Sequence, residues 1–221
     1  MIDPLEIELV RFLHTWHGPP IAPREPLPSE QLWLPEPLRE WYELSSQWSN
    51  SLTDIKMFCA PGEIREEDGK AIFLEEPGGH SWAIDVNNQM DVYERQLNDR
   101  WEKSSEELPE FLLHNALNEV AYKAPAWRSS DRVAGEYLPV ILAPMIEVGF
   151  GEWQWPRPGH RVFLGAGLVA NIGPASEIHW PWGNAPGYSE VHIAATAPEL
   201  LIYLSKVSGI RWSTHPYSDI G

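Results

Sequence analysis

Cysteine is almost absent from this chain. Cys59 is the only one among 221 residues, so no disulfide can form within the molecule. Such scarcity is typical of a reducing compartment. No unbroken apolar run approaches the ~20 residues that a membrane-spanning helix needs. Asp3, Glu6 and Glu8 give the first residues the wrong charge for a signal peptide. We therefore expect a cytoplasmic protein.

Basic residues are also scarce. Lys and Arg total 16 against 32 Asp and Glu, which gives a formal net charge of −16. The imbalance lies mainly in residues 1–124, where 24 acidic and 10 basic side chains leave a net −14. Such a chain lacks the clustered cations that bind nucleic acid, and it repels anionic membranes. The charge predicts either plain solubility, which is the simpler interpretation, or a protein partner with a basic surface.

The clearest structural signals lie in the middle of the chain. An apolar run before Pro77-Gly78-Gly79 and an alternating run from Trp82 to Val86 predict an antiparallel hairpin with one buried face. A third strand is expected at Met90 to Tyr93. Ser104 to Glu107 has the pattern of a capping box. The apolar stripe from Leu108 to Val120 predicts a helix that lies across the hairpin.

Further elements are expected on both sides of this stretch. Asp3-Pro4 begins a helix that ends at Gly18, and five prolines between positions 19 and 28 predict an extended arm. A second helix is expected from Glu36 to Gln47. Other patterns predict strands at Ile55–Cys59, Arg161–Leu164, Leu168–Ile172, Val191–Ala194 and Ile210–Ser213, loops at Glu63–Asp68 and Ile178–Gly187, and a last helix after the capping-box pattern Thr196–Glu199.

The order of these features carries a family resemblance. Leu34-Pro35 precedes a helix with Trp41-Tyr42, and then come Ile72-Phe73, Trp82 to Asp85, Val92-Tyr93, Trp101 and Leu108 to Leu112. This order, over about residues 30–122, resembles the SUKH superfamily, which includes a yeast cell-wall-synthesis regulator domain and many bacterial immunity proteins. The proline-broken region before the hairpin and the last third of the chain depart from that pattern.

The resemblance implies an α+β fold in which helices pack around a mixed, strongly bent β-sheet. It divides the chain into an N-terminal helix and proline-rich arm (1–28), a SUKH-like core (29–124) and an additional C-terminal α/β extension packed on the core (125–221). It also implies a non-enzymatic, protein-binding function, since bacterial members act as immunity or antitoxin-like proteins that neutralise toxins. Many of those toxins are nucleases, whose basic clefts would suit an acidic inhibitor.

Two alternative functions stay open. One is a cellular regulator or scaffold of the same fold, in which the N-terminal helix and arm recruit another chain. The other is a carbohydrate-binding protein or hydrolase that uses the loops with Trp153, Trp155, Trp180 and Trp182. Exposed tryptophans are typical of binding surfaces, although tryptophans that anchor loops in the core are the simpler interpretation.

Seven carboxylates around the hairpin are the candidate partner-binding residues: Glu63, Glu66, Glu67, Asp68, Glu75, Glu76 and Asp85. Carboxylates at turns normally diverge into solvent, whereas general acid–base chemistry needs two that converge in a cleft. We therefore expect them to bind a basic partner, with a merely solvated face as the simpler interpretation.

Three patterns suggest other chemistry, and each lacks its context. His14 and His17 stand one helical turn apart without further metal ligands at a recognisable spacing, so a solvent-facing pair is the simpler interpretation. Cys59 and the distant His80 carry no local signature of a nucleophile and its base. The run from Gly165 to Ala170 matches G-x-G-x-x-A, but no helix is expected to follow it. We assign no catalytic residue, metal or cofactor.

Overall fold

The computed structural model describes residues 1–97, 99–151, 153, 155–177 and 183–215. Its α-helices are α1 (Leu9–His17), α2 (Glu36–Ser45), α3 (Leu108–Lys123) and α4 (Leu138–Ile141). The 3-10 helices are η1 (Pro4–Glu6), η2 (Ser29–Gln31), η3 (Pro61–Glu63), η4 (Gly135–Tyr137) and η5 (Pro198–Lys206). The strands are β1 (Met57–Phe58), β2 (Arg65–Glu67), β3 (Lys70–Glu76), β4 (His80–Asp85), β5 (Asp91–Gln96), β6 (Glu102–Glu107), β7 (Ala126–Ala134), β8 (Met145–Glu147), β9 (Arg161–Gly165), β10 (Leu168–Ser176), β11 (Asn184–Ala195) and β12 (Ser213–His215).

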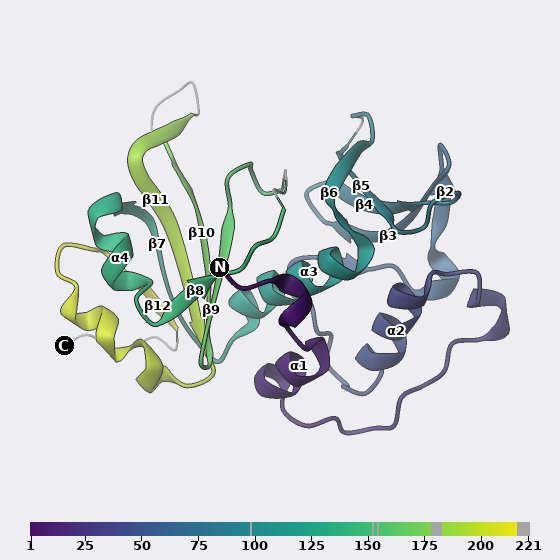
Figure 1. Cartoon of the computed structure of the whole chain (residues 1–221), viewed down its shortest axis with the longest axis horizontal. Coiled ribbons are helices and arrows are strands. Elements are labelled where there is room, and N and C mark those ends of the chain that lie inside the picture. The colour runs from purple at the N-terminus through teal and green to yellow at the C-terminus, as the bar shows by residue number, and fades with distance from the viewer. Residues whose placement is uncertain (98, 152, 154, 178–182, 216–221) are drawn as a thin grey trace.

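The strands form two six-stranded sheets, which confirms the α+β class. The first sheet has the order β1-β3-β4-β5-β6 with β2 paired to β3, and the second has the order β12-β7-β11-β10-β9-β8. Every pairing between these described strands is antiparallel, rather than mixed as the resemblance implied. Figure 1 shows the two sheets on opposite sides of α3.

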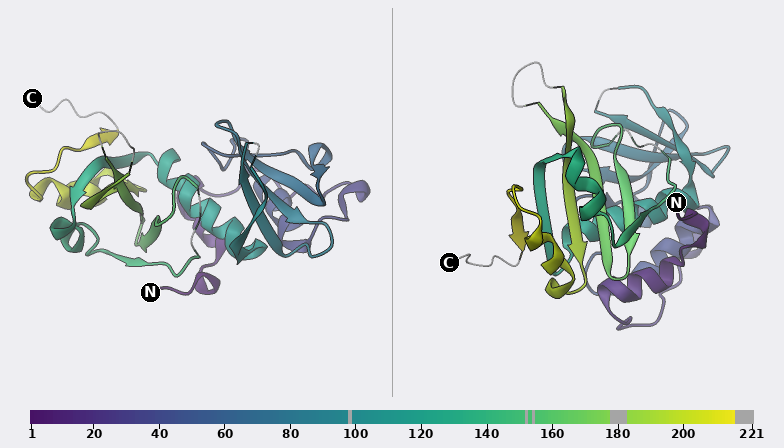
Figure 2. Two further views of the ribbon diagram at one scale, coloured as in Figure 1. Left: turned by 90° about the horizontal axis from the view of Figure 1, so that it is seen from above. Right: turned by 60° about the vertical axis from the view of Figure 1, so that its left-hand side comes forward.

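Helix α3 joins the two halves of the molecule. Most of its residues are buried, including the polar side chains of His114, Asn115, Asn118 and Glu119. Toward the first sheet, Phe111 packs edge-on against Phe73. Toward the second, the same apolar cluster continues into Val162, Val169 and Ala194. The sequence predicted one apolar stripe, but a sheet covers the helix on each side, as the view from above shows (Figure 2).

The N-terminal helix belongs to the core and is not a free appendage. Asp3 Oδ1 accepts a hydrogen bond from Leu5 N at the start of η1, and α1 follows and ends at Gly18. Phe12 and Leu13 are buried in the same cluster as α3. The proline-rich arm is held at α2, where the Glu25 amide donates to Ser46 Oγ at 2.9 Å.

The predicted hairpin is confirmed as β3 and β4, with Trp82 and Ile84 fully buried. Both capping-box predictions are wrong. Ser104 to Glu107 lies in β6, and α3 begins only after it, with Glu107 as an N-cap that makes no side-chain hydrogen bond. The segment after Thr196 is the 3-10 helix η5, which has no side-chain cap either. In each case the chain enters the helix directly from a strand or an extended residue. A Pro in the first turn then fixes the φ angle that the helix needs.

Two predicted loops also contain strands. Glu63 to Asp68 was expected to be a turn, but Arg65–Glu67 pairs with β3 as the exposed strand β2. Of the predicted loop Ile178–Gly187, residues 178–182 lie outside the described residues, and β11 already begins at Asn184. No helix of the described residues is long and apolar enough to cross a membrane.

Candidate functional site

The outer face of the first sheet carries ion pairs rather than a row of free carboxylates. Arg65 pairs with Glu75 at 2.7 Å, and Arg95 pairs with Glu67 at 2.5 Å. Lys70 pairs with Asp85 at 2.7 Å and also lies over the ring of Tyr93. Three of the seven predicted partner-binding carboxylates are therefore neutralised within the sheet.

Hydrogen bonds from these cations lower the pKa of each of the three carboxyl groups. Arg65 acts on Glu75, Arg95 on Glu67 and Lys70 on Asp85. Because the three groups stay ionised and paired, a partner's cation would have to displace a local one before it could bind there.

The other four predicted carboxylates divide between two places. Glu63, Glu66 and Asp68 are exposed on η3, β2 and the turn after it. Strand β2 lies at an edge of the sheet, where charges also prevent pairing with a second chain. Glu76 lies apart from them, at the β3–β4 turn, and its carboxylate folds back over Gly78.

Glu76 lines a cleft that the sequence did not reveal. The cleft has a volume of about 740 Å³ and lies between the β3–β4 turn, the β5–β6 connection and the segment at Trp155. We call it the acidic cleft and define it by Glu76, His80, Glu94, Asp99, Glu102 and Trp155. Arg95 and Arg100 also line it, so four carboxylates face two guanidinium groups and leave a net −2 with His80 neutral.

The inner wall of the acidic cleft is formed by a buried carboxylate and its histidine partner. Glu94 is only 3% exposed, and its Oε2 lies 3.2 Å from His80 Nε2. Glu94 and Glu102 stand opposite each other on β5 and β6. Asp99 and Glu102 are exposed, so the open side of the cleft is acidic and accessible.

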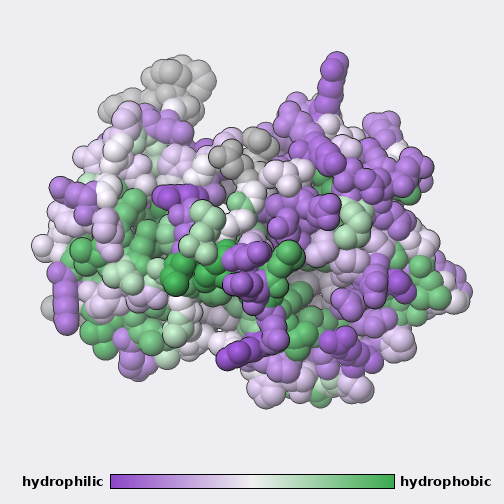
Figure 3. Space-filling model, viewed as in Figure 1, coloured by the Kyte–Doolittle hydropathy of each residue, from purple (hydrophilic) through white to green (hydrophobic). Residues whose placement is uncertain are grey.

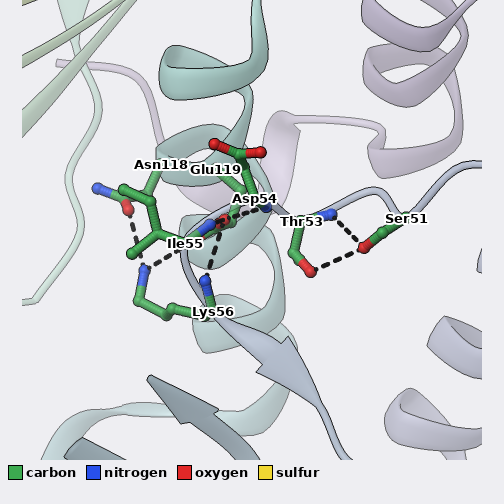
Figure 4. A network of polar contacts seen from close by, with 7 residues as sticks. All are labelled: Ser51, Thr53, Asp54, Ile55, Lys56, Asn118 and Glu119. Carbon is green, nitrogen blue, oxygen red and sulfur yellow. Dashed lines mark hydrogen bonds and ion pairs between the residues drawn. The ribbon is translucent and has the colours of Figure 1, made fainter. Parts of the chain in front are cut away.

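Directly behind Trp155 lies a buried cation. Lys56 Nζ sits 4.0 Å from the centre of the Trp155 ring and contacts the rings of Trp82 and Trp153 as well. Nζ donates to Asn118 Oδ1 at 2.9 Å and lies 3.1 Å from Glu119 Oε1 (Figure 4). Burial lowers the pKa of Lys56 to about 8, although Glu119, Glu76 and Glu94 act in the opposite direction.

Glu119 also fixes the chain that carries Lys56. Its Oε2 accepts hydrogen bonds from the backbone amides of Asp54 and Ile55 at 2.6 and 2.8 Å (Figure 4). Both oxygens of this buried carboxylate therefore have partners, Lys56 at Oε1 and the two amides at Oε2. The side chains of Lys56 and Glu119 are fully buried, so the pair holds the segment before β1 against α3 and is not accessible to a ligand.

A second buried network ties the last third of the chain to the first sheet. Glu106 Oε2 accepts a hydrogen bond from Trp153 Nε1 at 2.8 Å, and Glu106 Oε1 lies 2.7 Å from His114 Nδ1. The His114 ring stacks on Trp153. Trp153 is therefore a core residue, as the simpler interpretation held. Trp155 reaches the acidic cleft, and Trp180 and Trp182 lie outside the described residues.

The remaining candidates are not assembled into reactive sites. His14 is exposed, but His17 is half buried, and burial lowers the pKa of His17 to about 4, so the expected solvent-facing pair is wrong. Burial raises the pKa of the Cys59 thiol to about 11, and its Sγ contacts Glu75. The glycines of the G-x-G-x-x-A pattern form the β9–β10 turn, where a strand follows instead of a helix. Among the described residues no group of three or more His, Cys, Asp or Glu could hold a metal ion.

An apolar groove of about 600 Å³ runs between the N-terminal segment, α2 and the start of α3. Leu5, Leu9, Trp41, Leu44 and Leu113 line it together with Glu8, Glu40 and Glu110. Leu5 is 77% exposed at its edge. Figure 3 shows hydrophilic residues crowded over the first sheet, while apolar residues gather around a hollow near the N-terminal helices.

Sequence reasoning named Glu76, His80 and Trp155 for three different reasons, and it missed Glu94, Asp99 and Glu102. Asp99 and Glu102 flank a connection that gave no strand signal, and Glu94 lies just beyond the strand expected at Met90 to Tyr93. The available signal was the spacing of Glu94, which stands two residues after the apolar Val92 and therefore on the same face of the strand.

Comparison with protein-family models, with curated proteins and with solved structures finds no match to this chain.

Proposed function

We propose that this chain is a non-enzymatic protein-binding module whose acidic cleft receives Lys or Arg side chains of a basic protein partner. One observation supports this most directly. The cleft is wide enough for a long side chain, and it combines carboxylates at its mouth with the indole of Trp155. Carboxylates pair with a cationic head, and an aromatic ring packs against the apolar stem or faces the cation.

We base the proposed class of the partner on the resemblance to immunity proteins. An immunity or antitoxin-like protein would present this cleft to a toxin, and a nuclease toxin offers the basic surface that the charge requires. Its association would be steered by charge and would weaken as salt increases. The exposed Glu63, Glu66 and Asp68 would add to this steering, while the paired Glu67, Glu75 and Asp85 would contribute little.

The test uses the protein encoded next to this chain, if that neighbour is a toxin. The two proteins are mixed, and affinity is measured by calorimetry at low and high salt. The triple variant Glu76→Lys/Asp99→Lys/Glu102→Lys should lose at least 100-fold in affinity and no longer protect cells that express the toxin. The control Glu30→Lys/Glu136→Lys/Glu199→Lys makes the same charge change at exposed positions outside the cleft, and should bind within a few-fold of the natural chain. Equal binding by both variants would refute the cleft as the site.

A carbohydrate-binding or hydrolytic function is a second candidate at the same place. It is favoured by the position of Trp155 beside carboxylates that line the same cleft. The flat face of an indole packs well against a sugar ring. Binding of neutral oligosaccharides would hardly depend on salt and would be lost in Trp155→Ala, whereas a basic partner should show a steep salt dependence.

The scaffold or regulator function has a separate observation in its favour, namely the apolar groove. Deletion of residues 1–28 would not test it, because Phe12 and Leu13 belong to the core. The exposed side chain of Leu5 permits a cleaner variant, Leu5→Asp, which should leave the fold intact and abolish binding only of a partner that docks in the groove.

A further inference from the structure

A small polar pocket lies where the second sheet meets the end of α3. It has a volume of about 200 Å³. Its walls include Tyr122 from α3, Ser129 and Asp131 from β7, Asn171 from β10, and Glu190 and His192 from β11. We call it the polar pocket. It shares no lining residue with the acidic cleft or with the apolar groove.

Asn171 is the anomaly in this pocket. The residue is 5% exposed, and its side-chain amide reaches only the oxygen of Tyr122, so that Oδ1 has no hydrogen-bond partner among the described residues. Leaving a buried polar group without a partner costs about 1–3 kcal/mol. An amide side chain in the middle of a buried strand is therefore expected to meet a polar molecule in the adjoining space.

The neighbouring groups restrict the charge of that molecule. Glu190 is already engaged, because Arg157 donates to its Oε2 at 2.9 Å and His160 Nε2 lies 3.2 Å from its Oε1. Asp131 adds a negative charge at the exposed side. An anion would face both carboxylates, while the charge of Glu190 is offset by Arg157 and needs no further cation.

The hydrogen-bonding pattern restricts the ligand further. Burial lowers the pKa of His192, and its Nε2 donates to Ala121 O at 2.7 Å, so Nδ1 of the neutral ring is an acceptor. Asn171 offers an acceptor and a donor side by side. An ammonium group only donates and a carboxylate only accepts, whereas a hydroxyl group does both.

Size completes the argument. A water molecule takes up ~30 Å³ in the liquid, so the polar pocket has room for about six waters or for one compact organic molecule of the same bulk. We propose that the polar pocket binds a small, uncharged polyhydroxylated molecule, of the size of a free pentose or hexose, with its hydroxyl groups on Asn171. This inference does not depend on the protein-binding function.

The side-chain amide of Asn171 provides a direct readout. In the ¹⁵N-labelled full chain its NH₂ signals are identified by their loss in Asn171→Asp. D-ribose, D-glucose and glycerol are then titrated, with ethylammonium chloride and inorganic phosphate as charged probes. We expect at least one sugar to shift these signals in a saturable way at millimolar concentration, and the charged probes to cause no saturable shift.

Two variants locate the binding. Ser129→Ala removes a lining hydroxyl without touching the core, and should weaken sugar binding at least 5-fold as judged by backbone amide shifts. Ser176→Ala removes an exposed serine of the same strand as Asn171, outside the pocket, and should bind like the natural chain. The proposal is overturned if no hydroxylated probe saturates, which would mean that water alone fills the pocket, or if both variants bind equally.

Discussion

Lys56 Nζ lies 3.1 Å from Glu119 Oε1, and neither side chain exposes any surface. The pair connects the segment before β1 to the C-terminal half of α3, the helix on which both sheets pack. Taking two charges out of water is costly, and their attraction offsets that cost only when further hydrogen bonds complete the site. Here Asn118 and the amides of Asp54 and Ile55 supply them.

Breaking this pair should destabilise the protein strongly. Glu119→Gln keeps an acceptor for the backbone amides but leaves Lys56 buried without a counter-charge, so we expect a loss of about 3 kcal/mol in the free energy of unfolding by urea. Lys56→Met should cost a similar amount. The double variant should lose clearly less than the sum of the two, because no lone charge remains.

An exposed pair serves as the control for that cycle. Lys103 and Asp91 are 2.7 Å apart, but the Lys103 side chain is 55% exposed. Asp91→Asn should therefore change stability by less than about 1 kcal/mol. Additive losses at Lys56 and Glu119 would contradict the coupling that the geometry implies.

The core of the first half should not fold alone. A chain that ends at Ala124 would expose the side of α3 that the second sheet covers. It would lose the apolar cluster that α3 shares with Val162, Val169 and Ala194. It would also lose the hydrogen bond that Trp153 Nε1 donates to Glu106 Oε2. We expect such a chain to show little cooperative unfolding by circular dichroism and to aggregate, while the full chain unfolds cooperatively. A sharp transition in the shortened chain would show that residues 1–124 are an independent domain.

The central hairpin could be predicted from the sequence because it depends on local signals. The alternation of large side chains at Trp82 and Ile84 with small or polar neighbours and the Pro-Gly-Gly turn act over a few residues. The edge strand β2 carried a signal that was overlooked: Asp68-Gly69 lies at the β2–β3 turn with φ of 53° and 72°, and this dipeptide favours hairpin turns.

What could not be predicted depends on contacts between distant segments. The buried polar face of α3 is explained only by partners far away in the sequence, such as Lys56 for Glu119 and Glu106 for His114. The carboxylates around the hairpin could be seen in the sequence, but not that Arg65 and Arg95 neutralise two of them. The acidic cleft brings together three separate segments, so no local pattern marks it.

Removing the Nε1 donor of Trp153 should weaken the contact between the last third of the chain and the first sheet. Trp153→Phe keeps an aromatic ring on His114 but leaves Glu106 Oε2 without its hydrogen bond, so we expect a loss of about 1–3 kcal/mol in unfolding by urea. Trp212→Phe is the matched change, because the buried Nε1 of Trp212 has no partner among the described residues. That variant should be neutral or slightly stabilised, and an equal loss in both would rule out the hydrogen bond as the cause.

The half-buried His17 should make stability depend on pH. Burial, helped by the charge of Lys123, lowers the pKa of His17 to about 4 in the folded chain, against 6.5 for the exposed side chain. As pH falls from 6.5 toward 4, His17 becomes protonated in the unfolded chain but stays neutral in the folded chain. The free energy of unfolding therefore decreases. Well above pH 6.5 the ring is neutral in both states and contributes no pH dependence.

The expected size can be isolated with His17→Gln, which cannot titrate. Between pH 7 and pH 5 the natural chain should lose about 1 kcal/mol more unfolding free energy than this variant, after allowance for the part of the ring that reaches solvent. His160, whose pKa is also lowered to about 4, remains in both proteins and cancels in the comparison. Urea unfolding of both chains at the two pH values measures the difference. Parallel losses would mean that His17 is protonated equally in the folded and unfolded chain, and so is not shielded by the rings and α-helices around it.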